Sequence, residues 1–345
     1  MIKKDMNRKK RYGKCIEHRK VAVTKTSLDV LEAVFSQELV RTNHLYGLLP
    51  HRHPSGLLNT LRILHEAGLL EKVGDRPSKL TTAINIYDPD IYLLTDEGER
   101  FLMNRRTPVR YVNTYRPRGD YRIEHLHKLG ISDSIANIRN GARATPCTIV
   151  GEGAIKQISG LDPHLPLKLP VTVRSNLSGV WRSWSGDLTP DGLFAIQYED
   201  GRQSFVALEY QNTGAVRANT FLGTSSMRRK YLGYVDAYYN KSFQRHWNIP
   251  NLRVLCIFAQ DDDYRASLKL GAELFPEGNP MFLHIHLPKY HETSSGFLLA
   301  PKPFPGLFSA PLTRIGKEPV ALYDATEDPS KFQFRKQGLP ALMGT

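Results

Sequence analysis

The chain has 345 residues, of which 41% are hydrophobic and 23% are charged, and its formal net charge at pH 7 is +13. This balance excludes a disordered chain, and the length is sufficient for two domains. Three scattered cysteines do not support a disulfide framework, and no apolar run approaches the roughly 20 residues that span a bilayer. The positive charge favours a polyanionic partner. We therefore expect a soluble, cytoplasmic protein that binds nucleic acid and no membrane.

The first 24 residues form a basic arm. Residues 1–20 contain nine Lys or Arg side chains against two acidic ones, Asp5 and Glu17. Such a block of like charge is commonly a solvated tail. The functional alternative is an arm that follows DNA phosphates and adds affinity without sequence preference.

Residues 25–104 show the element order of a winged helix-turn-helix domain, in which the third helix enters the major groove of DNA. Apolar residues at helical spacing predict the helices, and capping residues and Pro or Gly mark their ends. The predicted elements are a helix capped by Ser27, a helix from Thr42 or Asn43 to Pro50, a helix from Pro54 to Gly68, strands over 69–73 and 87–94 around a polar wing at 74–85, and a helix capped by Thr95.

Polar and basic side chains of this domain are candidates for DNA contact. The third helix and the residues before it would face bases and phosphates, and the wing would contact phosphates. The alternative is a winged helix that binds only protein, which the basic surroundings disfavour. The candidates are Arg52, Ser55, Asn59 and Arg62 near the third helix, and Arg76 and Lys79 in the wing.

A basic, aromatic linker at 105–121 separates this domain from a second one at 122–299, and a Pro-rich extension follows at 300–345. The second domain is predicted to have the order α-β-β-β-α-β, which makes the whole chain mixed α/β. Its predicted elements are a helix over 121–139, a strand over 147–150, a loop-like stretch over 151–186, strands over 193–198 and 204–210 around an Asp200-Gly201 turn, a helix over 219–243, a strand over 252–259, a helix over 263–274 and a strand over 281–287. The Pro-rich extension is predicted to be irregular.

Two carboxylates are predicted to meet at one edge of the central hairpin. Asp191 begins one strand and Glu209 ends the other, at nearly equal distances from the turn at 200–201. Gln211 lies two residues beyond Glu209, so the two side chains point to the same face. Oxygen ligands of this kind suit a hard cation, and we expect Mg²⁺ or Mn²⁺ if the site is catalytic.

This arrangement resembles the PD-(D/E)XK nuclease fold. The resemblance implies that Asp191 and Glu209 are the two metal-binding carboxylates, with Gln211 in the position of the usual lysine. Since Gln has no positive charge, Lys230 or Arg228 on the following helix could supply it, and Glu124 would be the acid of the first helix. The alternative is a degenerate nuclease fold that holds DNA without cutting it.

Taken as a whole, residues 25–290 resemble the replication-relaxation family of mobile-element proteins, and they are similar to the MOBC-type mobilization relaxases. The order of short motifs carries this resemblance: the winged helix, a helix with His125, Pro190-Asp191-Gly192, the strand that ends at Leu208-Glu209, the helix with Lys230-Tyr231-Leu232, and Val254–Phe258 followed by Tyr264-Arg265. It implies a protein that nicks or positions DNA in plasmid replication or conjugative mobilization.

Other residues offer alternative candidate sites. His284 and His286 share one strand face, as metal-binding histidines of HUH nucleases do, and Tyr290 and the tyrosines of 231–239 are nearby, but packing is the simpler role. Arg228 and Arg229 are candidates for backbone contact, although a solvated helix face explains them as well. We expect double-stranded DNA at an origin or operator as the partner, with homodimerisation left open. The chain is either a metal-dependent nickase with Asp191, Glu209, Gln211 and Lys230 as catalytic residues, or a non-catalytic origin-binding or regulatory protein.

Overall fold

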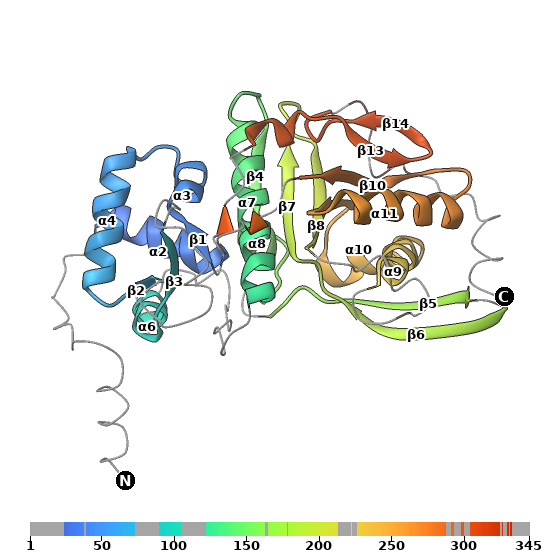
Figure 1. Ribbon diagram of the computed structural model, residues 1–345, viewed down its shortest axis with the longest axis horizontal. Helices are drawn as coiled ribbons and strands as arrows, with labels where there is room; N and C mark the ends of the chain where they lie inside the picture. Colours follow the sequence, from blue (N-terminus) through green and yellow to red (C-terminus); the bar gives the residue numbers. More distant parts are fainter. Residues whose placement is uncertain are drawn as a thin grey trace, which may run out of the picture. The chain divides into compact units, whose positions relative to one another are not determined.

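The protein has a mixed α/β fold with a large mixed sheet (Figure 1). The computed structural model describes residues 24–37, 39–72, 90–104, 122–162, 165–177, 179–212, 226–287 and 304–324, and the positions 222, 291–292, 298–299, 326, 330 and 332. The chain divides into two compact units, residues 1–136 with 290–303 and residues 137–289 with 304–345. None of the helices in the described ranges has the length and hydropathy needed to cross a bilayer.

Among its described residues, the first unit packs helices around a three-stranded sheet with the order β1-β3-β2. Its core is made of the apolar helix stripes that the sequence shows, including Leu31, Leu57 and Leu61, which are fully buried. The elements are α2 (Lys25–Gln37), β1 (Val40–Arg41), α3 (Thr42–Leu48), α4 (Pro54–Glu66), β2 (Leu70–Lys72), β3 (Ile91–Leu94) and α6 (Asp96–Asn104).

The helix ends of this unit follow local capping chemistry, with two corrections. Neither Thr42 nor Asn43 caps α3, because both lie inside that helix and its N-cap residue is Arg41. Thr95 Oγ1 accepts a hydrogen bond from the backbone N–H of Gly98 at 3.0 Å, which confirms Thr95 as a cap. Ser27 is not a cap, because it lies inside α2, and its backbone N–H donates to Thr24 Oγ1 at 3.2 Å. The polar wing segment, with Arg76 and Lys79, lies outside the described residues.

A buried polar cluster was not predicted from the sequence. Arg41 and His44, each 2% exposed, both pair with the carboxylate of Asp133 on α7 (Arg122–Ala142), and Ser132 Oγ lies 2.9 Å from His44 Nδ1. Burial alone would raise the pKa of Asp133, but the interactions with His44 and Arg41 outweigh burial and hold that pKa below its ordinary value. Short-range charge pairing thus fixes β1 and α3 to this part of α7.

The second unit contains a seven-stranded sheet with the order β14-β13-β10-β9-β8-β7-β4. The pairs β4–β7 and β7–β8 are antiparallel, β8–β9 and β9–β10 are parallel, and β13 and β14 add antiparallel strands beyond β10. The elements are β4 (Thr148–Gly151), α8 (Glu152–Ile158), β5 (Leu169–Leu177), β6 (Val180–Leu188), β7 (Gly192–Gln197), β8 (Gln203–Gln211), α9 (Met227–Tyr239), α10 (Ser242–Trp247), β9 (Arg253–Phe258), α11 (Asp261–Leu274), β10 (Asn279–His286), η2 (Pro305–Phe308), β13 (Leu312–Ile315) and β14 (Lys317–Val320). The short strands β11 (His291–Glu292) and β12 (Leu298–Leu299), which pair with each other, belong to the first unit.

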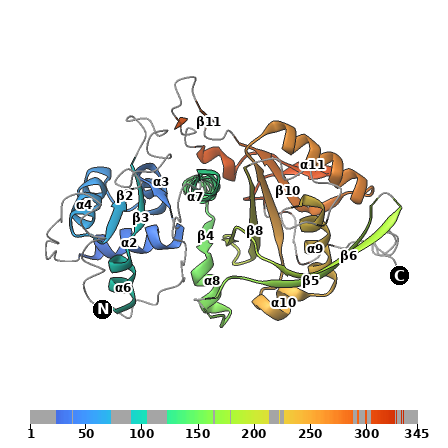
Figure 2. The same ribbon diagram turned by 60° about the horizontal axis from the view of Figure 1, so that its bottom comes forward.

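Three predictions for the second unit were wrong. The stretch 151–186 is not a loop, since it contains α8 and the antiparallel β5–β6 pair, which extends away from the seven-stranded sheet (Figure 2). The single helix over 219–243 is interrupted, because α9 ends at Tyr239 and Lys241 adopts a left-handed backbone (φ 52°) before α10. The Pro-rich extension is not wholly irregular, because β13 and β14 complete the sheet.

Candidate active site

The geometry of the β7–β8 hairpin places Asp191 beside Glu209. Gly192 pairs with Leu208, so the residue before Gly192 stands opposite the residue after Leu208. The backbone N–H of Asp191 donates to the Leu208 carbonyl at 2.9 Å, which continues the ladder by one residue. Asp191 Oδ2 in turn accepts the backbone N–H of Tyr210 at 2.8 Å. The Asp200-Gly201 turn sets this register, since Gly201 adopts a left-handed φ of 83°.

Glu209 is a carboxylate in the interior of the second unit, with 1% of its surface exposed. Tyr234 Oη donates a hydrogen bond to Oε1 at 2.6 Å, and Lys230 Nζ forms an ion pair with Oε2. Lys230 and Tyr234 are four residues apart on α9, so one face of the helix presents both to the same carboxylate. Both oxygens of Glu209 therefore have a donor from α9.

The charges of this cluster perturb one another. Burial raises the pKa of Glu209 above its ordinary value; the nearby Lys230 ammonium lowers it, and the Asp191 carboxylate adds to the rise. Burial tends to lower the pKa of Lys230, but Glu209 and Asp191 together outweigh it and raise that pKa. Lys230 is therefore a cation that forms an ion pair with Glu209 and is also stabilised by the nearby charge of Asp191. Such mutually perturbed groups are common at catalytic sites, and also in structural ion pairs.

Gln211 lies on the same face of β8 as Glu209, two residues further along the strand. It is 5% exposed, and its Nε2 has no hydrogen-bond partner among the described residues. Burial of an amide group without a hydrogen-bond partner costs folding free energy, so such a group calls for an explanation such as contact with a ligand. In this position Gln211 could contact a ligand that enters between the two carboxylates.

The donor set fits a hard divalent cation in part. Asp191, Glu209 and the Gln211 amide supply oxygen ligands of the type that Mg²⁺ and Mn²⁺ prefer. Among the described residues, no group of three or more His, Cys, Asp and Glu side chains is arranged to hold a metal. A cation would replace Lys230 at Glu209 Oε2, so the lysine must move when the ion binds.

The candidate DNA-contact residues of the first unit surround the start of α4. Ser55 and Asn59 are exposed, and exposed Arg62 donates to Asn59 Oδ1 at 3.0 Å and pairs with Glu66 at 2.8 Å. Arg52 is paired with Asp29 on α2 at 2.7 Å. Ser55, Asn59 and Arg62 are therefore on the surface of α4, whereas Arg52 also ties the start of α4 to α2.

Arg228 and Arg229 point toward the β5–β6 pair. Arg229 is 7% exposed and its guanidinium lies 4.4 Å from the ring centroid of Trp184, while Arg228 donates to Ser175 Oγ at 3.3 Å. These contacts make both arginines part of the packing between α9 and this strand pair. The side chain of Glu124 lies outside the described residues.

The two strand histidines do not form a metal pair. His284 is 1% exposed and its Nε2 lies 2.6 Å from Tyr231 Oη, which also contacts Ser267 Oγ at 2.5 Å, whereas His286 is exposed. Burial lowers the pKa of His284 to about 4. Sequence reasoning missed Tyr234 as the partner of Glu209; its spacing of four residues from Lys230 was the available signal.

No protein-family model matches the chain, and no curated protein or solved structure is significantly similar to it.

Proposed function

We propose that this chain is a metal-dependent DNA nickase or endonuclease of a mobile element, related in its plan to replication-relaxation proteins and mobilization relaxases. The observation that carries the proposal is the opposed pair Asp191 and Glu209 on adjacent strands, with Lys230 from the covering helix at the same point. Two carboxylates that can hold a metal ion, with a positively charged side chain beside them, are the groups that phosphodiester hydrolysis needs.

The arrangement of elements supports this proposal. With α8, the β5–β6 pair and α10 set aside as insertions, the elements α7, β4, β7, β8, α9 and β9 follow the α-β-β-β-α-β order of a PD-(D/E)XK core. The four strands among them are neighbours in the sheet. The helices and three-stranded sheet of the first unit follow the order of a winged helix-turn-helix domain. In this proposal α4 finds the DNA site, and the second unit cleaves one strand.

Each residue of the cluster has a defined role in the proposal. Asp191 and Glu209, with the Gln211 amide oxygen, would hold Mg²⁺ or Mn²⁺, and such an ion supplies an acidified water and stabilises charge on phosphate oxygens. Tyr234 holds the Glu209 carboxylate in one orientation through its hydrogen bond. Lys230, once released from Glu209, carries its positive charge to the scissile phosphate and compensates for the charge that Gln211 lacks.

A second candidate function is DNA binding without cleavage at an origin or operator. The observation that favours it is the saturation of Glu209, because Tyr234 and Lys230 engage both carboxylate oxygens. A nuclease-like fold that has lost its cation would be held together by such an internal ion pair. Under this candidate the first unit alone would account for the function.

Nicking of supercoiled plasmid that carries the native origin separates the two candidates. The full-length protein should nick it with Mg²⁺ or Mn²⁺ and not with excess EDTA. Asp191→Asn and Glu209→Gln should each abolish nicking, whereas Glu199→Gln, an exposed acid at the other end of the same hairpin, should not. Nicking that survives both site substitutions rejects the assigned site. Specific binding without nicking by the wild-type protein favours the second candidate.

A further inference from the structure

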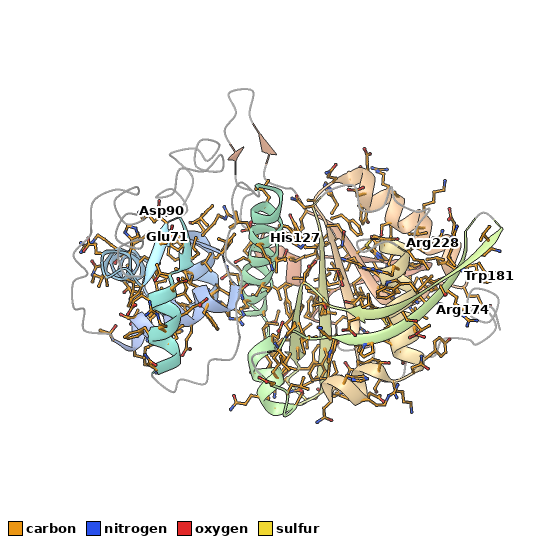
Figure 3. All side chains as sticks on the ribbon, turned by 90° about the horizontal axis from the view of Figure 1, so that it is seen from below. Glu71, Asp90, His127, Arg174, Trp181 and Arg228 are labelled. Carbon is orange, nitrogen blue, oxygen red and sulfur yellow. The ribbon has the colours of Figure 1, made fainter. Side chains whose placement is uncertain are left out.

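The β5–β6 pair has a surface that the proposed active site does not use. Cross-strand neighbours share a face, and the face directed away from α9 contains the pairs Thr172–Ser185, Arg174–Ser183 and Asn176–Trp181. All six residues are exposed, and Trp181 is 47% exposed. We call β5 and β6, residues 169–188, the ribbon, and these six residues its outer face. Figure 3 shows Arg174 and Trp181 on the ribbon.

The opposite face holds the ribbon on α9. Its alternating residues Leu169, Val171 and Val173 are buried, and a Cβ on Gly233 of α9 would come within 2.6 Å of Leu188 Cδ1. Asp236 of α9 accepts the backbone N–H of Thr172 at 3.0 Å. With the contacts of Arg228 and Arg229 described above, these interactions fix the ribbon to the helix that carries Lys230.

We propose that the ribbon enters the major groove of duplex DNA and that its outer face contacts base edges. This inference rests on the DNA-binding part of the proposed function and adds a second recognition element to it. A two-stranded ribbon fits this groove, which is roughly 12 Å wide, because its strands are only about 4.8 Å apart. Nine-residue strands extend about 30 Å at roughly 3.3 Å per residue, which is long enough to lie in the groove across several base pairs.

The chemistry of the outer face favours DNA over a protein partner. Arg, Asn, Ser and Thr are the side chains that hydrogen-bond to base edges, and no acidic residue lies among the six. Arg182, exposed near the ribbon tip, pairs with Ser175 and so belongs to the opposite face. Asp187 pairs with Pro170 and continues the outer face at its base, where it lies 3.5 Å from Lys168. Together with the chain's net charge of +13, this surface complements a polyanion. A protein-docking face would be expected to be more apolar at its centre.

Binding to a pool of random-sequence 30-base-pair duplexes, followed by sequencing of the bound fraction, tests the inference with the full-length protein. The double substitution Arg174→Ala with Asn176→Ala should weaken binding to the duplexes preferred by the wild type by about tenfold or more. It should also flatten the base preference at the positions that these side chains contact. Lys317→Ala, which removes one exposed positive charge from β14 in the same unit, should retain the preference.

The substituted side chains are exposed, so the thermal unfolding midpoint should not change and serves as the folding check. Unchanged affinity and preference of the double variant overturn the inference. The inference is also overturned if the double variant loses affinity only for single strands of the same sequences, because the ribbon would then bind an unpaired strand. The readout is independent of cleavage: if Asp191→Asn and Glu209→Gln still nick, the nuclease assignment fails while the binding result stands. If the wild-type protein binds no duplex, both the ribbon inference and the proposed function are rejected.

Discussion

Removal of the Lys230 ammonium is expected to destabilise the second unit strongly. Glu209 is 1% exposed, and in Lys230→Met its carboxylate keeps, among the described residues, the Tyr234 hydroxyl as its hydrogen-bond donor. Removal of one partner from a buried ion pair costs about 3–5 kcal/mol. Because the Lys230 side chain is 16% exposed, the pair is not fully dry, and we expect the lower end, about 3 kcal/mol.

Urea-induced unfolding followed by tryptophan fluorescence measures this loss. The chain has three tryptophans, at positions 181, 184 and 247, and all belong to the second unit, so the signal reports on the unit that contains the pair. The double variant Lys230→Met with Glu209→Gln removes both charges and should recover about 2 kcal/mol relative to Lys230→Met alone. A Lys230→Met variant within about 0.5 kcal/mol of the wild type would refute the reasoning.

The same variants also test the cation. If Mg²⁺ and Lys230 compete for Glu209, millimolar Mg²⁺ should raise the unfolding free energy of Lys230→Met more than that of the wild type. The double variant, which lacks the Glu209 carboxylate, is the matched control and should show no such gain. An equal effect on all three proteins would place any bound Mg²⁺ elsewhere.

Three further predictions concern stability. Burial lowers the pKa of His284 from 6.5 to about 4, so this side chain stays neutral in the folded protein, whereas the unfolded chain takes up a proton below about pH 6.5. The free energy of unfolding should therefore fall by about 3 kcal/mol as the pH drops from 6.5 to 4. His284→Gln should lose most of this pH dependence. Gly98→Ala should destabilise the first unit by about 3 kcal/mol, because the added Cβ would lie 2.2 Å from the Leu69 carbonyl oxygen, while Gly56→Ala, whose Cβ meets nothing within 4 Å, should stabilise it by up to about 1 kcal/mol; opposite signs in thermal unfolding are the check. Thr95→Ala should cost about 1 kcal/mol by removing the cap of α6, and Thr95→Ser should restore it; equal losses in both variants would contradict the capping role.

The opposed carboxylates could be predicted because local information fixes them. The Asp200-Gly201 turn determines the hairpin register, and counting outward from it brings residue 191 opposite residue 209. The partners of Glu209 could not be found in this way, since they depend on how α9 rotates on the sheet. Only the spacing of Lys230 and Tyr234 shows, in retrospect, that both can reach one point.

The ribbon was missed because its sequence signals conflict. Pro170 and Gly179 indicate turns, and the alternation of Val171 and Val173 is short. The ribbon packs on a helix rather than in the central sheet, so just one side of β5 is buried and most of β6 is exposed. Its pairing depends on a tertiary contact that local propensity does not encode.

The two sides of α9 have a mechanical consequence. A helix turns by about 100° per residue, so a one-residue insertion near its start would rotate Lys230 away from Glu209 and Arg229 away from Trp184 together. Since both side chains turn by the same angle, one counter-rotation of α9 would restore both contacts together. The orientation of α9 therefore couples the Lys230–Glu209 ion pair to the contact between Arg229 and the ribbon, and the two are kept or lost together.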